Sequence, residues 1–198
     1  MTNPPAKMMV ESLIELLTPM GETTGSDVNW VAAEEYYGTP LPSDYKLFIT
    51  KIGSGSIEGQ LDVRAPSNHG EPEQSRVTRL APHALTDPSV NRWSDPDLAQ
   101  RYSLHQMLLW GEGVQADTLC WLTADPDPDK WPVAVYVRAD SAWTIHDCTM
   151  SEFLVELLQG NFMHCPLSDL SLMGWPTPRF LHEHDEQALE DQGIYPWN

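Results

Sequence analysis

Basic residues are scarce in this chain. Lys and Arg together number 11 among 198 residues, whereas Asp and Glu number 29, which gives a formal net charge of −18. Such a surplus of negative charge opposes binding to nucleic-acid phosphates and to anionic membrane surfaces. We therefore expect neither nucleic acid nor membrane as a partner. The same surplus fits a solvated surface that keeps the protein soluble, or an acidic face that recognises a basic protein.

Cysteine is equally sparse, and long apolar runs are absent. Cys120, Cys148 and Cys165 are odd in number and show no C-x-x-C spacing, so we expect no disulfide framework and a reducing compartment. The apolar run at residues 8–17 is interrupted by two glutamates, which argues against a secretory signal or a membrane span. The sequence therefore predicts a cytoplasmic protein.

Motifs for catalysis and cofactor binding are also missing. The glycine-rich run 53–59 has Glu58 where a dinucleotide fingerprint needs glycine, and no Gly-Lys-Ser/Thr follows it as in a phosphate loop. His182 and His184 offer an alternative, a metal site, but residues two apart diverge on a helix and there is no H-E-x-x-H. No histidine stands at a local spacing that suits a cysteine nucleophile. We expect a non-enzymatic protein with no cofactor and no metal.

Length and apolar content fit one folded domain, since 41% of the residues are hydrophobic and eight are tryptophan. The clearest local signal lies at residues 41–59. Four residues there follow the i, i+3, i+4, i+7 spacing of an amphipathic helix: Tyr45, Phe48, Ile49 and Ile52. Pro42 suits the start of this helix and Gly53 its end. Alternating polarity then predicts a strand over residues 57–63.

Further elements are expected on both sides of this segment. Amphipathic spacing predicts helices over about residues 9–20 and 26–38. Short strands are predicted at residues 107–110, 118–123, 132–137 and 143–146. Residues 149–152 match a capping box ahead of an apolar helix that ends at Gly160. Short strands at this spacing, with little between them, predict a meandering antiparallel sheet closed by a helix.

Two stretches lack this regularity. Five prolines punctuate residues 64–105, which we interpret as a loop-rich insertion with a helical turn at 95–100. Residues 183–191 carry five carboxylates and no Lys or Arg, which fits either an acidic helix packed on the domain or a partly mobile tail. The predicted organisation is an N-terminal helical extension at 1–25, a central domain at 26–160 and an acidic C-terminal extension at 161–198.

The order of these pieces resembles the SUKH superfamily, which includes bacterial toxin-immunity proteins and fungal cell-wall regulators. The first matching motif is L-P-x-D-Y-K-x-F, followed after six residues by G-x-I, within residues 41–59. Later matches lie at Leu108–Gly111, Ala116–Trp121, Trp131–Val133 and Phe153–Leu158. With Trp30 included, the match spans about residues 30–160. The resemblance implies an α+β fold, in which a mixed, largely antiparallel sheet of about five to six strands packs with N-terminal helices and a closing C-terminal helix. It also implies a protein that binds rather than catalyses.

Bacterial members of this superfamily are commonly immunity proteins that sit beside a polymorphic toxin and block it by tight association. The resemblance therefore implies that this chain binds a cognate toxin domain, and the acid surplus favours a basic one. Fungal members suggest the alternative, an intracellular regulator or scaffold that binds a housekeeping partner. The superfamily is too broad for its fold to identify the partner.

The second block of strands supplies the candidate binding residues. Tryptophan is favoured as an interface anchor, although it is also a common core residue. Carboxylates in turns would steer a cationic partner. The candidate partner-binding residues are Trp110, Glu112, Asp117, Trp121, Asp125, Asp127 and Asp129.

Overall fold

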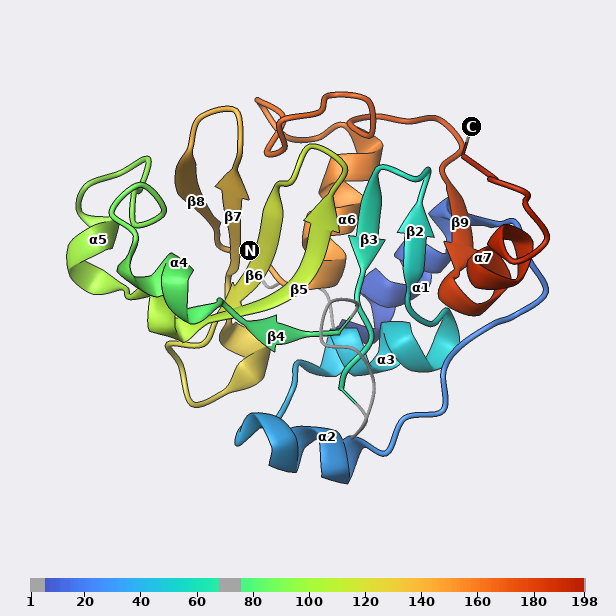
Figure 1. Ribbon diagram of the computed structural model, residues 1–198, viewed down its shortest axis with the longest axis horizontal. Helices are drawn as coiled ribbons and strands as arrows, with labels where there is room; N and C mark the ends of the chain where they lie inside the picture. The colour runs from blue at the N-terminus through green and yellow to red at the C-terminus, as the bar shows by residue number, and fades with distance from the viewer. Residues whose placement is uncertain (1–5, 68–75, 198) are drawn as a thin grey trace.

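The computed structural model describes residues 6–67 and 76–197. It has the α+β architecture that the sequence predicts (Figure 1). The α-helices of the described residues are α1 (Ala6–Leu16), α2 (Trp30–Tyr37), α3 (Ser43–Lys51), α4 (Pro82–Thr86), α5 (Leu98–Arg101), α6 (Met150–Gln159) and α7 (Glu183–Glu190). In the described part of the chain, the 3-10 turns are η2 (Leu104–Gln106) and η3 (Pro128–Lys130). Among the described helices, none combines the length and apolar composition needed to span a bilayer.

The strands form one mixed sheet that is larger than predicted. They are β1 (Thr18–Pro19), β2 (Gly55–Ile57), β3 (Leu61–Val63), β4 (Thr78–Arg79), β5 (Met107–Gly113), β6 (Thr118–Leu122), β7 (Val133–Val137), β8 (Ala142–His146) and β9 (Arg179–His182). Their order is β1-β9-β2-β3-β5-β6-β7-β8, with β4 paired to β5 beside this path. β1 runs parallel to β9, and the other pairs are antiparallel. The expectation of five to six strands was therefore too low.

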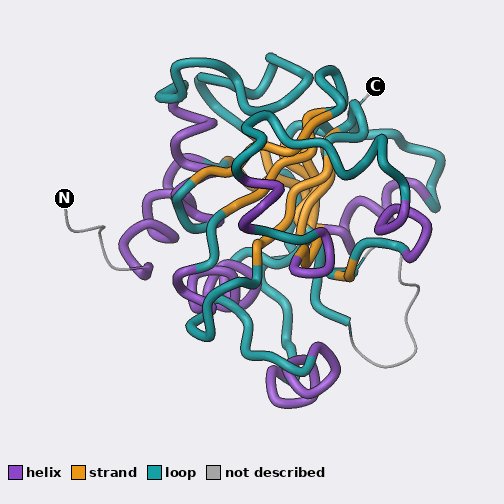
Figure 2. The backbone as a smooth tube through the Cα atoms, turned by 90° about the vertical axis from the view of Figure 1, so that its left-hand side faces the viewer, coloured by secondary structure: helices purple, strands orange, loops and turns teal. Residues whose placement is uncertain are grey.

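Helices α1, α3 and α6 contact one another and cover one face of the sheet. Their buried residues, such as Leu13, Phe48 and Leu157, belong to the same core as Trp110 and Trp121 of the sheet. Figure 2 shows the strands as a central layer with helices on both sides. This packing removes the apolar stripes of three helices from water, which is the main favourable term in folding.

Helix α6 begins and ends where the sequence predicts, although β9 and α7 of the same domain follow it. The hydroxyl of Thr149 accepts from the Glu152 N–H, and the Glu152 carboxylate accepts from the Thr149 N–H at 2.8 Å, which completes the capping box. Gly160 ends the helix with φ of 72°. Glycine tolerates this left-handed conformation without strain.

The predicted strand at residues 57–63 is instead a hairpin, β2 and β3. Glu58 and Gly59 adopt φ of 54° and 63°, and the Gln60 N–H donates to the Ile57 carbonyl at 2.9 Å. Positive φ at both central residues is the signature of a tight hairpin turn. The alternation of apolar and polar residues continues through this turn, so the sequence pattern does not reveal the turn.

Residues 80–104 are more ordered than the expected loop-rich insertion. They cover the second face of β6, β7 and β8 with a smaller apolar cluster, in which the Trp93 and Trp143 rings lie 6.4 Å apart. The expected helical turn at 95–100 is α5, at residues 98–101. The segment therefore acts as the second covering layer for that end of the sheet.

Both expected extensions belong to the domain. Val10 and Leu13 of α1 are fully buried in the main core. β9 lies inside the sheet, between β1 and β2, so the segment 161–198 contributes an interior strand. Its charged part is the ordered helix α7, which contacts β2 and β9. The described residues of 1–25 and 161–198 thus complete the sheet and core rather than extending them.

Candidate functional site

The two candidate tryptophans are core residues, and their predicted role as surface anchors needs correction. Trp110 and Trp121 have no exposed surface. Their rings lie 6.0 Å apart, and Trp121 meets the Tyr45 ring edge-on at 4.8 Å. Both side chains point to the face covered by helices. The predicted partner contact is therefore absent for this pair in the folded structure.

Asp117 is also buried, with 1% of its surface exposed. Its carboxylate accepts hydrogen bonds from the Arg138 N–H at 2.8 Å and from the Ser168 N–H at 2.7 Å. It thereby ties the β7–β8 turn to the segment after α6. Asp117 has a structural role in place of the predicted partner contact.

Glu112 remains accessible, but it lies apart from the acidic loop. It stands on β5, directly opposite Asp62 of β3, and pairs with the Arg64 guanidinium. Its side chain is 44% exposed. The structure thus separates Glu112 from the three aspartates with which the sequence grouped it.

Asp125, Asp127 and Asp129 lie at the surface in the loop that contains η3. Asp125 accepts from the Asp127 N–H at 2.9 Å, and Asp127 accepts from the Asp129 N–H at 3.2 Å. Asp129 accepts from the Ser43 N–H at 2.6 Å, which fastens the loop to α3. The Trp131 indole donates to the Asp125 carbonyl at 2.6 Å. These bonds hold the carboxylates on an ordered backbone, which lowers the entropy cost of binding.

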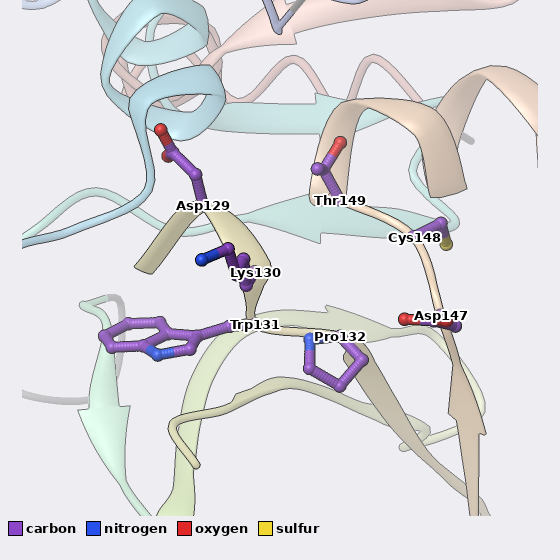
Figure 3. A pocket seen from close by; sticks show the side chains of 7 residues that line it. All are labelled: Asp129, Lys130, Trp131, Pro132, Asp147, Cys148 and Thr149. Atoms are coloured by element: carbon purple, nitrogen blue, oxygen red, sulfur yellow. The ribbon is translucent and has the colours of Figure 1, made fainter. Parts of the chain in front are cut away.

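A pocket of about 310 Å³ opens beside this loop. Figure 3 shows Asp129, Lys130 and Trp131 on one side, with Asp147 and Cys148 from the β8–α6 turn on the other. The Asp147 carboxylate is directed into the pocket (Figure 3). It forms no hydrogen bond or ion pair with the residues that the structure describes. Lys130 pairs with Asp127 at 3.2 Å, and this carboxylate raises the lysine pKa.

The electrostatics of this pocket suit recognition of a cationic group. Asp129 and Asp147 contribute two carboxylates, and the single lysine is already paired outside them. Burial raises the pKa of the Cys148 thiol to about 12, so the thiol stays protonated and is a poor nucleophile. The pocket can therefore accept hydrogen bonds and positive charge, and its own cysteine is not activated for attack.

Sequence reasoning missed Lys130 and Asp147 as neighbours. Seventeen positions separate them in the chain, and they meet because β7 and β8 pair in antiparallel register with Val133 opposite His146. The strands themselves were predicted, but the sequence does not give their register. The closest signal in the sequence is the short spacing of two predicted strands. Lys130 lies just before the first of them and Asp147 just after the second.

One further pair resembles a nucleophile and base. The Ser26 hydroxyl lies 3.3 Å from Nε2 of His182. However, Nδ1 of His182 accepts the His184 N–H at 3.1 Å, so in the neutral ring Nε2 carries the proton and cannot accept one from Ser26. Burial also lowers the His182 pKa. The arrangement caps α7 and is not built for general-base chemistry.

The geometry of His182 and His184 bears on the alternative prediction of a metal site. His182 is 2% exposed, whereas His184 lies at the surface, and their ring centroids are 5.0 Å apart. Nδ1 of His182 is engaged by the backbone of α7. Within the described residues, no group of three or more His, Cys, Asp or Glu side chains converges to hold a metal ion.

Comparisons with known proteins found no relative of this chain. No protein-family model matches the chain, and neither a curated protein nor a solved structure matches it. The likeness to the SUKH superfamily therefore rests on the order and spacing of the motifs.

Proposed function

We propose that this chain is a protein-binding module of the immunity type, which binds a cognate, basic toxin domain and acts without catalysis. The observation that carries the proposal is the Asp147 carboxylate, which faces an open pocket beside the ordered acidic loop. The net charge of −18 and the motif order within residues 30–160 support it. The binding surface consists of Asp125, Asp127, Asp129 and Asp147.

The physical basis is electrostatic complementarity. An acidic patch on a strongly acidic protein raises the encounter rate with a basic partner, often by one to three orders of magnitude at low salt. Once docked, an Arg or Lys of the partner can pair with Asp147 inside the pocket. Charge-assisted hydrogen bonds of this type are about twice as strong as neutral ones. Because the loop is already ordered, forming these bonds costs little conformational entropy.

The first test is co-purification of the chain with the product of the adjacent gene. If that product is a basic toxin domain, an inactivated form of it serves as the ligand for kinetic binding measurements. We expect the association rate constant to fall at least about tenfold between about 50 and 300 mM salt. A salt-insensitive rate would contradict the electrostatic proposal. Co-purification of a housekeeping protein instead would favour the regulator or scaffold alternative.

The second test locates the surface. The double variant Asp127→Asn with Asp147→Asn removes two negative charges from the pocket and loop. The control, Asp95→Asn with Asp97→Asn, changes the net charge equally on the exposed segment before α5. We expect the first variant to weaken toxin binding about tenfold or more, and the control less than about threefold. Equal effects of both would show that total charge, and not this surface, determines binding.

A further inference from the structure

A second recess lies on the sheet face opposite the main helical layer. In Figure 1 the stretch of β3 and β5 between α7 and α4 has no helix over it. The recess has a smaller lobe of about 230 Å³ toward α7 and a larger one of about 730 Å³ toward α4. Arg64 and Glu112 line both lobes. The two lobes therefore adjoin at this ion pair, and together they are called the groove below.

The smaller lobe concentrates carboxylates. Its charged lining residues are Asp62, Arg64, Glu112, Glu183 and Glu186. Glu112 pairs with Arg64, and Glu183 pairs with Arg76 at 3.0 Å. Asp62 lies directly opposite Glu112 across the β3–β5 ladder. Like charges in such a cross-strand pair are destabilising, so the fold tolerates repulsion at this place.

Asp62 and Glu186 contact neutral partners in the described structure. The Ser56 hydroxyl hydrogen-bonds to Asp62, and the Trp197 indole donates to Glu186 at 2.6 Å. Partial removal from water raises the pKa of both carboxyls, Glu112 further raises that of Asp62, and Asp62 further raises that of Glu186. Solvent still reaches Asp62. Both carboxylates line the smaller lobe. A cation bound in the lobe would offset the negative charge of these two carboxylates.

The larger lobe is mainly apolar. Leu80, Ala81, Pro82 and Leu109 line it, together with the exposed Arg79. Leu80 and Leu109 are only partly buried. An apolar side chain placed on them would remove further surface from water, at roughly 25 cal/mol per Å². An acidic lobe thus adjoins an apolar one along the groove.

We propose that this groove binds an extended segment of a partner protein that carries a Lys or Arg beside a large apolar side chain. The cation lies between Asp62 and Glu186, and the apolar side chain packs on Leu80, Pro82 and Leu109. Charge complementarity selects this occupant, because the described carboxylates of the smaller lobe outnumber the guanidinium groups that pair with them. The inference rests on the proposed protein-binding function and gives it a second contact surface.

A labelled, acetylated hexapeptide of alternating Leu and Lys is the probe for a fluorescence-polarisation titration. Matched peptides of alternating Gly and Lys, and of alternating Leu and Glu, separate the apolar and cationic contributions. We expect the Leu-Lys peptide to bind at least about tenfold more tightly than either control peptide. Equal binding of the Leu-Glu peptide, or no binding of the Leu-Lys peptide, would overturn the assignment.

Variants then locate the binding. Asp62→Asn with Glu186→Gln is expected to weaken the Leu-Lys peptide at least about tenfold, whereas Asp95→Asn with Asp97→Asn changes its affinity less than about twofold. Leu80→Ala is expected to weaken the Leu-Lys peptide and leave the Gly-Lys peptide unchanged. Equal weakening by both charge pairs would mean that net charge alone attracts the peptide, and the groove assignment would fail.

The same variants separate this inference from the proposed function. If the toxin complex forms and the Asp62/Glu186 variant leaves both its affinity and the peptide affinity unchanged, the groove assignment fails and the proposed function stands. If no basic protein partner binds while peptide binding still depends on Asp62 and Glu186, the immunity function fails and the groove remains a peptide site.

Discussion

Asp44 of α3 caps the first turn of α6. Its carboxylate accepts hydrogen bonds from both the backbone N–H and the hydroxyl of Ser151, at 2.8 and 2.9 Å. Asp44 is 2% exposed, and Ser151 is fully buried. The first N–H groups of a helix lack partners within it. The aspartate of the L-P-x-D-Y-K motif therefore joins two helices that are distant in the sequence.

Replacing Asp44 should weaken the domain. Asp44→Ala leaves the buried Ser151 N–H and hydroxyl without their acceptor, so we expect a loss of about 2–3 kcal/mol in the free energy of unfolding, measured by urea denaturation. Glu35→Ala, on the exposed face of α2, is the control and should change stability by less than about 0.5 kcal/mol. A loss of similar size in both variants would argue against the cap.

Acidification should destabilise the α7 end of the sheet through His182. Burial lowers its pKa below the ordinary value of about 6.5, so the folded state takes up the proton less readily than the unfolded state. The stability that depends on the neutral ring is full above about pH 7 and falls as the pH drops through the unfolded value. Protonation also turns the Nδ1 acceptor of the His184 N–H into a donor.

The variant His182→Asn tests this, because asparagine keeps an N-cap acceptor without titrating in this range. Urea midpoints between about pH 7.5 and 5.5 should fall less steeply for the variant than for the parent protein. Burial also lowers the pKa of His146, so some slope should remain. Identical slopes for both proteins would refute the role of His182.

Removing the charge of Asp62 should stabilise the protein. Its raised pKa means that ionisation is less favourable in the folded state, so at pH 7 the charge opposes folding. We expect Asp62→Asn to raise the free energy of unfolding by about 0.5 kcal/mol. The value is small because solvent reaches this side chain and screens its charge. The gain should vanish near pH 3, where the carboxyl is neutral in both states. Asp95→Asn serves as the control, and a loss of stability at pH 7 in Asp62→Asn would contradict the repulsion.

The cysteines should react slowly in the native protein. Burial raises the pKa of the Cys120, Cys148 and Cys165 thiols, that of Cys148 to about 12. At pH 8 only about one Cys148 thiol in ten thousand would then be ionised, and the thiolate is the reactive form. Alkylation by iodoacetamide, followed by intact-mass spectrometry, should be far slower in buffer than in urea. Rapid labelling of one thiol in the native state would refute this.

Local signals predicted most of the elements. The capping box at Thr149 and Glu152 located the start of α6, and Gly38 and Gly160 marked helix ends as expected. Short apolar runs between turn residues located β5 to β8. These features depend on neighbours in the sequence, so the sequence alone contains them.

Features that depend on distant contacts were missed. β9 has four residues next to prolines, and its partners are residues 18–19 and 55–57. The residue type at Glu58 also hid the β2–β3 turn, since glycine or asparagine is the usual choice at positive φ. A bidentate contact compensates, because Arg179 donates to both oxygens of Glu58, with its Nε at 3.1 Å from each.

The candidate site was predicted in part. Composition alone gave its acidic character, and the loop carboxylates Asp125, Asp127 and Asp129 do lie at the surface. The tryptophans were misplaced because alternation along β5 and β6 says which side chains share a face, but not which face the helices cover. Asp147 could be added only once the pairing of β7 with β8 was known.

The position of β9 has a consequence for synthesis on the ribosome. One edge of β2 is unpaired until Arg179–His182 have been synthesised. Thr18 likewise lacks its partner Arg179, which lies 161 positions later in the sequence. Exposed strand edges and long-range pairing favour aggregation and slow folding. The sheet of the nascent chain therefore remains incomplete until Arg179–His182 have left the exit tunnel, and chaperones have access to the unpaired edge of β2 until then.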